Sequence, residues 1–502
     1  MVALRFRIIL LIAALLAFGG ALWAPFQFDD FSLLTDAVMD SSDGWRQAFT
    51  LIQTRPLTYL TFWANLQASD APWGFHLVSL LTHLLCVWLA WEVVRELLPE
   101  RAAMVAAALF AVHPLQTEAV VYVFARATLL SAALSLLALR LWLKGRLWAA
   151  VGAFGVALLA KEEVAALPLL VALLEWGTRR RRAAAGPIAA MAGLSAAAGL
   201  RAVYAVGAVA GSGAGAQAGI TPFDYFSYQG VAMLRYLWLL LAPLGLTVDA
   251  EVRVAPLAAS LAWGVIAVVA VLSWRTVRAA QAGFWILGGL LLLLPSSSVF
   301  PAADLAADRR MYLPMLCFCG LLGLVLQKAD WRLLSGYAVV LTALSVAQTM
   351  VWQSPQSLWM EASRRAPEKV RPKRQLARVL PAEQAVELLE QARRQAPEDV
   401  GVAMDYGVVL LRAGRPELAL SEFGRALALE PGSATAIHNR GLALLAMGQP
   451  EAAEGDFRRA LERDPCLFDA LINLRRVGKA AAAPKGCQWT RAQREALLSS
   501  ER

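Results

Sequence analysis

The sequence predicts an all-α protein that consists of a polytopic membrane helix bundle and a C-terminal α-helical solenoid. Three observations support this prediction. Of the 502 residues, 58% are hydrophobic and 17% are charged, whereas an ordinary soluble domain is about 45–50% apolar, so most of the chain is suited to lipid. Long apolar runs follow one another through residues 1–352, and a repeat with a 34-residue offset occurs in the polar remainder, residues 353–502.

Eleven apolar runs are candidate membrane spans, because an α-helix needs ~20 residues to cross the hydrocarbon core. They occupy residues 1–23, 75–94, 102–121, 127–143, 147–160, 163–176, 187–210, 255–274, 282–299, 311–327 and 333–351. The first run could be a cleaved signal peptide, but we expect it to be retained, because the polar segment that follows, the first outer loop at 26–74, needs to be held at the membrane face. The fifth and sixth runs are short, and only Lys161 and Glu162 separate them. This predicts a tight helical hairpin with a charged tip.

The run at 231–246 is also short, contains Arg235 and is interrupted by Pro243, so we expect an interfacial or re-entrant helix there. With that exclusion and a cytoplasmic N-terminus, the basic loops fall on the cytoplasmic side, as the positive-inside rule requires. These loops contain Arg5, Arg7, Arg95, Arg101, Lys144, Arg146, Arg179 to Arg182, Arg275, Arg278, Lys328 and Arg332. Eleven spans then place the polar remainder on the non-cytoplasmic side. Arginine outnumbers lysine 40 to 7, which indicates GC-rich coding and favours a bacterial inner membrane with a periplasmic C-terminal domain.

The net charge of +9 would suggest a nucleic-acid partner in a soluble protein, but here the basic residues lie in short clusters between apolar runs. Such clusters set membrane topology, so no nucleic-acid partner is expected. The five cysteines lack the spacing of metal ligands. His76 and His83 each stand alone on an apolar helix and are expected to pack or to form hydrogen bonds rather than to bind a metal. In the polar tail, Cys466 and Cys487 suit either a disulfide or two free thiols.

The 34-residue repeat begins after Trp352. It pairs Gly407 with Gly441, Gly414 with Gly448, Pro416 with Pro450, Phe423 with Phe457, Ala426 with Ala460 and Pro431 with Pro465. This is the tetratricopeptide pattern, in which antiparallel helix pairs bury their apolar faces only against their neighbours. We expect two full repeats with degenerate flanking helices at 354–396 and 467–480. Such arrays dock partners and carry no chemistry of their own.

Charged residues gather at the predicted non-cytoplasmic ends of the spans. Asp29 and Asp30 directly follow the first span, where two adjacent carboxylates are costly to desolvate. They could bind a cation, activate a hydroxyl or cap a short helix that begins at Phe31. The same level contains His113, Glu118, Arg126, Lys161, Glu162, Asp304, Asp308, Arg309 and Arg310. A structural ion pair, such as Glu118 with Arg126, is an alternative reading, but the arrangement also suits transfer from a lipid-linked phosphate: a cation holds the phosphate, and a carboxylate takes the proton of an attacking hydroxyl.

Six motifs occur in order between about residues 25 and 375. They are Phe28-Asp29-Asp30, Arg55-Pro56-Leu57-Thr58, Trp73-Gly74-Phe75-His76-Leu77, His113-Pro114-Leu115-Gln116-Thr117-Glu118-Ala119-Val120, Lys161-Glu162 and Ala307-Asp308-Arg309-Arg310-Met311-Tyr312-Leu313-Pro314. Together with the repeats, they resemble the transmembrane-and-tetratricopeptide O-mannosyltransferases, which are polytopic glycosyltransferases of the GT-C class. The repeat array is shorter than in the animal members of that family.

The resemblance implies a GT-C-like bundle that takes a sugar, mannose in this family, from a polyprenyl-phosphate carrier. The acceptor would be a protein Ser or Thr hydroxyl or a glycan on the non-cytoplasmic face, docked by the repeats, and the anomeric carbon would be inverted. The acidic pair of the family carries over to Asp29, as the base or the group that orients the acceptor, and to Asp30, which supports it. Arg309 and Lys161 would hold the carrier phosphate, together with Arg310, which stands where the family has an aromatic or apolar residue.

Other residues in the matching motifs are expected to line the site. They are Arg55, His113, Glu118, Arg126, Glu162, Asp308 and Tyr312. Mannosyltransferases of this class generally need no metal, whereas its oligosaccharyltransferases do, so no metal or cofactor is expected besides the lipid-linked donor. Two alternatives stay open: an oligosaccharide ligase that moves a preassembled glycan, and a non-catalytic membrane scaffold that docks envelope proteins on its repeats.

Overall fold

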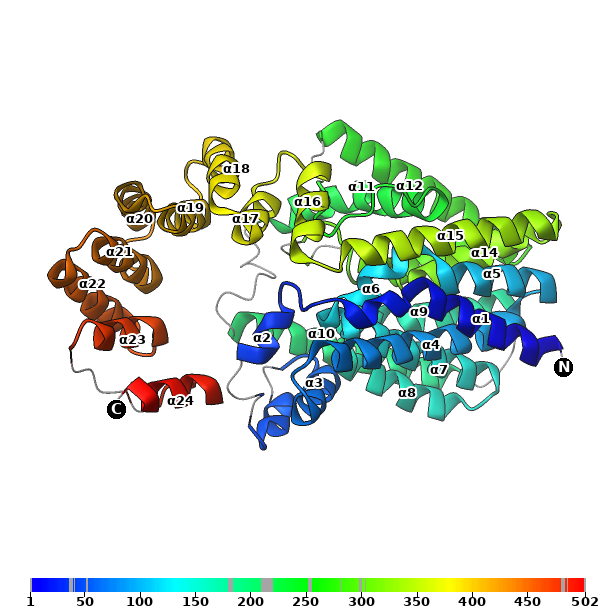
Figure 1. The fold of residues 1–502 in the computed structure, drawn as a ribbon. Coiled ribbons are helices and arrows are strands. Elements are labelled where there is room, and N and C mark those ends of the chain that lie inside the picture. Colours follow the sequence, from blue (N-terminus) through cyan, green and yellow to red (C-terminus); the bar gives the residue numbers. More distant parts are fainter. Residues whose placement is uncertain are drawn as a thin grey trace. The chain divides into compact units, whose positions relative to one another are not determined.

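The computed structural model describes residues 2–35, 39, 41–50, 53–178, 184–208, 220–251, 255–279, 281–297, 300–302, 304–479, 484 and 486–500. Helices make up the secondary structure of these residues and no β-strand is formed among them, which confirms the predicted all-α class. The chain folds as two compact units (Figure 1). We call Met1–Phe31 with Ser42–Ser354 the membrane unit, and Ser32–Ser41 with Pro355–Arg502 the repeat unit.

Six segments of the described membrane unit are helical, long and apolar enough to cross a bilayer. They are α1 (Val2–Phe18) with η1 (Gly19–Trp23), α4 (Pro72–Leu97), α7 (Arg126–Leu143) with η4 (Val123–Ala125), α10 (Ala185–Ala208), α12 (Pro256–Thr276) and α15 (Trp331–Val351). A seventh is the bent pair of α5 (Glu100–Val112) with η3 (Pro114–Gln116) and α6 (Thr117–Val121). The other four predicted runs form shorter helices, so the number of eleven spans stays a prediction. These are α8 (Leu147–Ala160), η5 (Glu162–Ala166) with α9 (Leu167–Thr178), α13 (Gln281–Leu293) and α14 (Pro314–Leu326).

The bend in the third run has a local cause. Pro114 has no backbone N–H, and the residue before a proline avoids the α region. His113 accordingly takes an extended conformation (φ −75°, ψ 133°) between α5 and η3, and the two helical directions differ by 48°. The chain then continues through the short elements η3, α6 and η4 before α7 begins at Arg126. The buried residues of this break lie at the end of the bundle at which the charged motifs meet.

The core of the membrane unit lies between α4, α5, α7 and α14, and α1 and α7 both pack against α4 (Figure 1). Small residues allow close helix packing, as is common in membrane bundles. A Cβ at Gly323 of α14 would collide with the carbonyl oxygen of Ala102 in α5, and one at Gly320 would collide with the Trp285 ring of α13. Glycine is therefore required on this face of α14.

The helix expected at 231–246 has different bounds from those predicted. It is α11 (Pro222–Leu241), which starts earlier because the Thr221 hydroxyl accepts the backbone N–H of Asp224 and caps it. Its polar first half buries Tyr225 and Gln229 against the bundle, so the apolar run alone underestimates its length.

The repeat unit is a series of helices, most of them of 9–14 residues, in the order expected for tetratricopeptide repeats. They are α16 (Pro355–Arg365), α17 (Val370–Val379), α18 (Ala382–Gln395), α19 (Val400–Arg412), α20 (Pro416–Leu429), α21 (Ala434–Ala446), α22 (Pro450–Arg463), α23 (Phe468–Arg476) and α24 (Arg491–Ser500). The flanking region at 354–396 forms α16, α17 and α18, and the one at 467–480 forms α23.

The repeated glycines have two separate structural causes. A Cβ at Gly407 would collide with the ring of Phe423, and one at Gly441 would collide with Phe457, so each repeat packs a glycine of one helix on the phenylalanine of the next. Gly414 (φ +68°) turns the chain between the helices of its repeat and needs the left-handed conformation that glycine adopts at low cost. The sequence period therefore records the packing of each helix pair.

Cys466 and Cys487 form a disulfide, with 5.4 Å between their Cα atoms. This settles the alternative that the sequence left open. The indole N–H of Trp489 donates to the carbonyl oxygen of Cys466 (3.0 Å), and Trp489 packs with Leu471 and Leu497. The disulfide thus holds the end of the chain against α23.

Replacement of Gly441 by alanine is expected to destabilise the repeat unit by about 1–3 kcal/mol, because the new methyl group overlaps the buried Phe457 ring. Calorimetry of the full chain in detergent measures the change. The matched control is Gly455→Ala in α22, where a Cβ meets nothing within 4 Å and alanine favours the helix. Equal melting temperatures for the two variants would show that the Gly441–Phe457 contact does not limit packing.

Candidate active site

The acidic pair after the first span divides into one buried and one exposed side chain. Asp30 begins α2 (Asp30–Thr35) and is fully buried. Its Oδ2 accepts the backbone N–H of Gln27 (3.0 Å), and its Oδ1 accepts that of Phe124 (2.8 Å). Asp29, in contrast, is exposed. Asp30 therefore fastens the first outer loop to η4, whereas Asp29 faces solvent.

The backbone before this pair is strained. Phe28 has a φ of 48°, in the left-handed region, and no other non-glycine residue in the described chain has a positive φ. An aromatic residue adopts this conformation only where surrounding contacts enforce it. The Phe28 ring packs edge-on against Tyr122 (5.5 Å between centroids) and Trp352 (6.1 Å). The contacts of Phe28 with Tyr122 and Trp352 therefore hold the turn from which Asp29 and Asp30 point in different directions.

Burial raises the pKa of the Asp30 carboxyl to about 8, although the backbone N–H groups of Gln27 and Phe124 oppose this shift, and the neighbouring Asp29 raises it further. Asp30 is accordingly mostly protonated at pH 7. A neutral Asp30 beside Asp29 reduces the repulsion between the two carboxyl groups.

Tyr122 contacts both Asp29 and Arg309. The Tyr122 hydroxyl donates to Oδ2 of Asp29 (2.9 Å), and the guanidinium of Arg309 lies over the Tyr122 ring, 5.9 Å from its centroid. Arg309 belongs to η7 (Asp308–Met311). The structure therefore brings Asp29 and Arg309, predicted as base and phosphate ligand, to the same tyrosine.

Two carboxylates hold Arg309. Its backbone N–H donates to Oε2 of Glu118 (2.9 Å), its guanidinium pairs with the other oxygen of Glu118, and Nη2 donates to Oδ2 of Asp304 (3.0 Å). Glu118 is buried, whereas the Asp304 side chain is 25% exposed. Burial opposes the charge of Arg309, but Glu118 and Asp304 outweigh this effect and raise the pKa of Arg309. The guanidinium is thus fixed and permanently charged.

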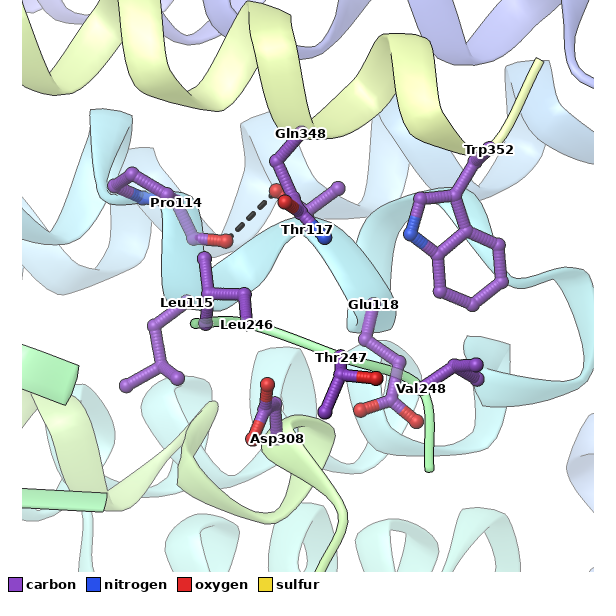
Figure 2. A pocket seen from close by; sticks show the side chains of 10 residues that line it. All are labelled: Pro114, Leu115, Thr117, Glu118, Leu246, Thr247, Val248, Asp308, Gln348 and Trp352. Atoms are coloured by element: carbon purple, nitrogen blue, oxygen red, sulfur yellow. Dashed lines mark hydrogen bonds between the residues drawn. The ribbon is translucent and has the colours of Figure 1, made fainter. Parts of the chain in front are cut away.

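A small pocket opens beside this pair, with an empty volume of about 220 Å³ that includes space open to solvent. Figure 2 shows the carboxylates of Glu118 and Asp308 and the hydroxyl of Thr247 on one side, and the indole ring of Trp352 nearby. Its full lining is Pro114, Leu115, Thr117, Glu118, Leu246, Thr247, Val248, Asp308, Gln348 and Trp352. An aromatic ring with several hydrogen-bonding groups is a suitable lining for a polar ring-shaped ligand.

A second charged cluster lies at the hairpin tip between α8 and α9. The Lys161 ammonium donates to Oγ1 of Thr128 (2.7 Å) and pairs with Oε2 of Glu163 (2.5 Å). Arg55 and Glu162 form a two-pronged pair at 3.2 and 2.7 Å. Lys161 is buried, while Arg55 and Glu162 are about one-third exposed.

Electrostatic effects connect the hairpin tip to Arg309. Burial lowers the pKa of the Lys161 ammonium, and the charges of Arg55 and Arg309 lower it further, against the opposing charge of Glu163. Burial would raise the pKa of Glu162, but the Arg55 guanidinium outweighs it and lowers this pKa to about 2. Lys161 is therefore within electrostatic range of both Arg55 and Arg309.

Two predicted site residues, Arg126 and His113, form hydrogen bonds that connect helices. Arg126 is fully buried and donates to Oδ1 of Asn65 (2.7 Å) and to the carbonyl oxygen of Phe75 (2.9 Å). The suggested Glu118–Arg126 pair is thus wrong, because Glu118 bonds Arg309 instead. His113 accepts the backbone N–H of Leu115 at Nδ1 and bonds the carbonyl of Leu240 through Nε2 (3.0 Å), which ties the helix break to α11.

Three further predicted residues have other partners. Tyr312 is buried in the helix core, where its hydroxyl bonds Nδ1 of His83 (2.7 Å). Arg310 donates to the carbonyl oxygens of Asp304 (2.6 Å) and Leu305 (3.2 Å), so it braces the loop before η7. Asp308 lines the pocket and pairs with Arg235 (2.5 Å). The roles of these residues in donor binding stay predictions.

The sequence did not identify four members of the site: Tyr122, Thr128, Glu163 and Trp352. Only Glu163 carried a signal, since it is the third charge of the hairpin tip. Tyr122 lies four residues after Glu118 and could have been placed on the same face of a helix, but an aromatic residue among apolar ones is usually core. Among the described residues, no group of three or more His, Cys, Asp and Glu side chains is arranged to hold a metal ion.

The protonation of Asp30 predicts how stability depends on pH. Because its pKa is raised in the folded protein, its contribution is fully present below about pH 4 and is lost as pH rises through about 8. The melting temperature of the wild type in detergent should therefore fall relative to that of Asp30→Asn between about pH 4 and 8, and the difference should be constant above pH 8. Lys161 is present in both proteins, so the difference isolates Asp30. Parallel curves over this window would contradict the prediction.

Comparisons with known proteins give two family matches. A model described as dolichyl-phosphate-mannose-protein mannosyltransferase matches residues 58–204, and a tetratricopeptide-repeat model matches residues 382–439. The first match includes Lys161 and the motif around Glu118, and the second includes part of the 34-residue repeat.

Individual relatives agree with these matches. Protein O-mannosyl-transferase TMTC3 of Mus musculus is 32% identical over 163 residues, which cover 29% of this chain and 18% of that protein. Protein O-mannosyl-transferase Tmtc1 of Drosophila melanogaster is 48% identical over 86 residues, covering 17% and 10%. A crystal structure of MamA is 17% identical, with a TM-score of 0.22, and the match covers 24% of this chain and 72% of that chain. The chain thus spans less than a fifth of the length of these two curated relatives. In these segments, which include membrane helices and tetratricopeptide repeats, the chain is similar to the transmembrane-and-tetratricopeptide O-mannosyltransferases.

Proposed function

We propose that this integral membrane protein transfers a mannosyl group from a polyprenyl-phosphate carrier to a hydroxyl group, in a protein or a glycan, on the non-cytoplasmic face. The observation that supports this most directly is the connection between an exposed carboxylate and a fixed cation: Asp29 and Arg309 both contact Tyr122 beside a small polar pocket. The names of the matching family and of the relatives favour mannose as the sugar.

In this proposal, Asp29 receives the proton of the acceptor hydroxyl while the acceptor oxygen attacks the anomeric carbon and the bond to the phosphate breaks. A carboxylate is a weak base for an alcohol, so the proton moves late, when the oxygen has already bonded to the sugar. The Tyr122 hydroxyl occupies Oδ2 of Asp29 and orients the carboxylate. Attack from the side opposite the phosphate inverts the configuration.

Arg309 stabilises the charge that develops on the departing phosphate, assisted by Lys161. Of the two carboxylates that hold Arg309, Asp304 is the more exposed, so we expect the phosphate to replace Asp304, while buried Glu118 keeps the guanidinium in position. Bidentate binding suits a guanidinium and a phosphate. Lys161 is buried and the Arg309 side chain is only 23% exposed. Electrostatic attraction to the phosphate is stronger where water is excluded.

The side chains that line the pocket can contact a sugar ring. Trp352 offers an aromatic face to the ring of a sugar, and Glu118, Asp308 and Thr247 offer partners for its hydroxyl groups. The names of the relatives, which are O-mannosyl-transferases, make the oligosaccharide ligase the weaker candidate.

The Cys466–Cys487 disulfide supports a repeat unit on the oxidising side of the membrane, because disulfides persist in such compartments and are rare in the cytosol. We propose that the membrane is a bacterial inner membrane and that the repeats dock the acceptor. A purely structural scaffold would not need an exposed Asp29 joined to Arg309, so this arrangement favours catalysis.

Asp29→Asn is expected to lower kcat by about 10²–10⁴-fold, because it removes the proton acceptor, while donor binding is retained. The assay uses the purified full chain with polyprenyl-phosphate mannose and a Ser/Thr peptide, and intact-glycopeptide mass spectrometry measures the product. The matched control is Asp70→Asn, an exposed carboxylate of the same outer loop. Equal rates for wild type and Asp29→Asn would exclude Asp29 as the base, and no hexose transfer by the wild type would favour the scaffold.

Arg309→Gln is expected to reduce kcat/KM by about 10²–10³-fold through the loss of charge stabilisation on the phosphate. Arg46→Gln, which removes an exposed arginine of the outer loop, should match the wild type in the same assay. If Arg309→Gln alters only the melting temperature and leaves kcat/KM unchanged, its ion pairs with Glu118 and Asp304 are structural.

A further inference from the structure

A third ionic cluster lies at the end of the membrane unit opposite to the candidate active site. Its centre is Glu92 of α4, whose side chain is only 2% exposed. Oε1 of Glu92 pairs with Arg7 of α1 (2.5 Å), and Oε2 pairs with Arg95 of α4 (2.9 Å) and Arg140 of α7 (3.4 Å). We call these four residues the Glu92 cluster.

The directions of the helices place the Glu92 cluster at the opposite end of the bundle from the site. Helix α4 begins at Pro72, near Phe75, which accepts a hydrogen bond from Arg126 at the start of α7. Glu92 lies near the C-terminal end of α4, and Arg140 lies near that of α7. The N-terminus of α1, marked in Figure 1, is at the same end as these two.

Positive charge exceeds negative charge in the Glu92 cluster. Three guanidinium groups share one carboxylate, and their side chains are only 27–31% exposed. Glu96, one turn after Glu92 in α4, pairs with Lys144 (2.5 Å), so its charge is neutralised outside the cluster. Within the described residues, the cluster therefore carries an excess of two positive charges, which is costly at the edge of a bilayer.

Two buried donors beside these charges have no acceptor. Among the residues described, neither Nε of Arg7 nor Nε1 of Trp91 has a hydrogen-bond partner. Arg7 follows Phe6, whose ring packs against the Trp91 ring with 4.8 Å between centroids, and Trp91 precedes Glu92 in α4. Buried polar groups normally find partners. Both donors need a hydrogen-bond acceptor, and the excess of positive charge in the cluster favours an anionic one.

We propose that the Glu92 cluster binds the phosphate group of an anionic membrane lipid, in the leaflet opposite to the candidate active site. Guanidinium groups bind phosphate oxygens in pairs, and basic clusters between helices at the bilayer surface recognise lipid headgroups. The surroundings suit a lipid: Arg140 lies over the Trp88 ring (5.5 Å), and α1 exposes Ile8 and Ile12, along which acyl chains can lie.

Native mass spectrometry of the full chain tests this site. Phosphatidylglycerol is titrated against the wild type, with phosphatidylcholine and inorganic phosphate as separate arms. Arg140→Gln should weaken phosphatidylglycerol binding about fivefold, the effect of one cation near an anionic surface. Arg95→Gln replaces Arg140→Gln if the latter does not purify. The matched control, Lys144→Gln, removes a cation whose partner is Glu96 and should leave binding unchanged.

Glu92→Gln distinguishes a lipid-binding site from an ionic cluster that only connects α1, α4 and α7. Removing the carboxylate raises the positive charge, so binding of phosphatidylglycerol should become tighter. A purely structural cluster would instead be weakened by both Glu92→Gln and Arg140→Gln. The proposal is overturned if Glu92→Gln and Arg140→Gln change binding in the same direction, or if phosphatidylglycerol binds no more tightly than phosphatidylcholine. Inorganic phosphate that binds as tightly as phosphatidylglycerol would identify a soluble ligand and overturn the assignment to lipid.

Discussion

Pro114 cannot donate a backbone hydrogen bond, and the helix that enters the bundle as α5 therefore ends at Val112. The short elements that follow supply the contacts on which the candidate site depends. Glu118 holds Arg309, Tyr122 holds Asp29, and the backbone of Phe124 holds Asp30. A continuous helix over the same residues would point these groups in several directions around its axis. The break instead directs them to one end of the bundle.

The first outer loop depends on this segment for its conformation. Two backbone N–H groups replace water as hydrogen-bond donors to the buried Asp30 carboxyl. Phe28 adopts a left-handed backbone conformation because its ring packs against Tyr122 and Trp352. The result is a rigid turn that presents Asp29 to solvent. Pre-organisation of this kind is valuable for transfer chemistry, because a group that is already in position loses little entropy when the acceptor arrives.

The two ends of the membrane unit differ in the balance of buried cations and carboxylates. At the candidate site, one arginine, Arg309, faces two carboxylates, and in the proposed function an incoming phosphate replaces Asp304 without leaving the arginine unpaired. In the Glu92 cluster, one carboxylate faces three arginines, and the excess charge needs an anion from outside the chain. In both places, the ratio of cations to carboxylates determines what the cluster can bind.

The sequence by itself determined the helical class, the apolar runs and the tetratricopeptide period, because these follow from local hydrophobicity and from steric needs such as Gly441 against Phe457. It also predicted Asp29, Asp30 and Arg309 as candidate site residues, since charges beside apolar runs are conspicuous. Only the tertiary structure decided which of the two aspartates is exposed, that Glu118 pairs with Arg309 rather than with Arg126, and that Tyr122 connects the site. Glu118 and Arg309 are 191 positions apart, and partners at such a distance are chosen by the packing of helices, which no local pattern records.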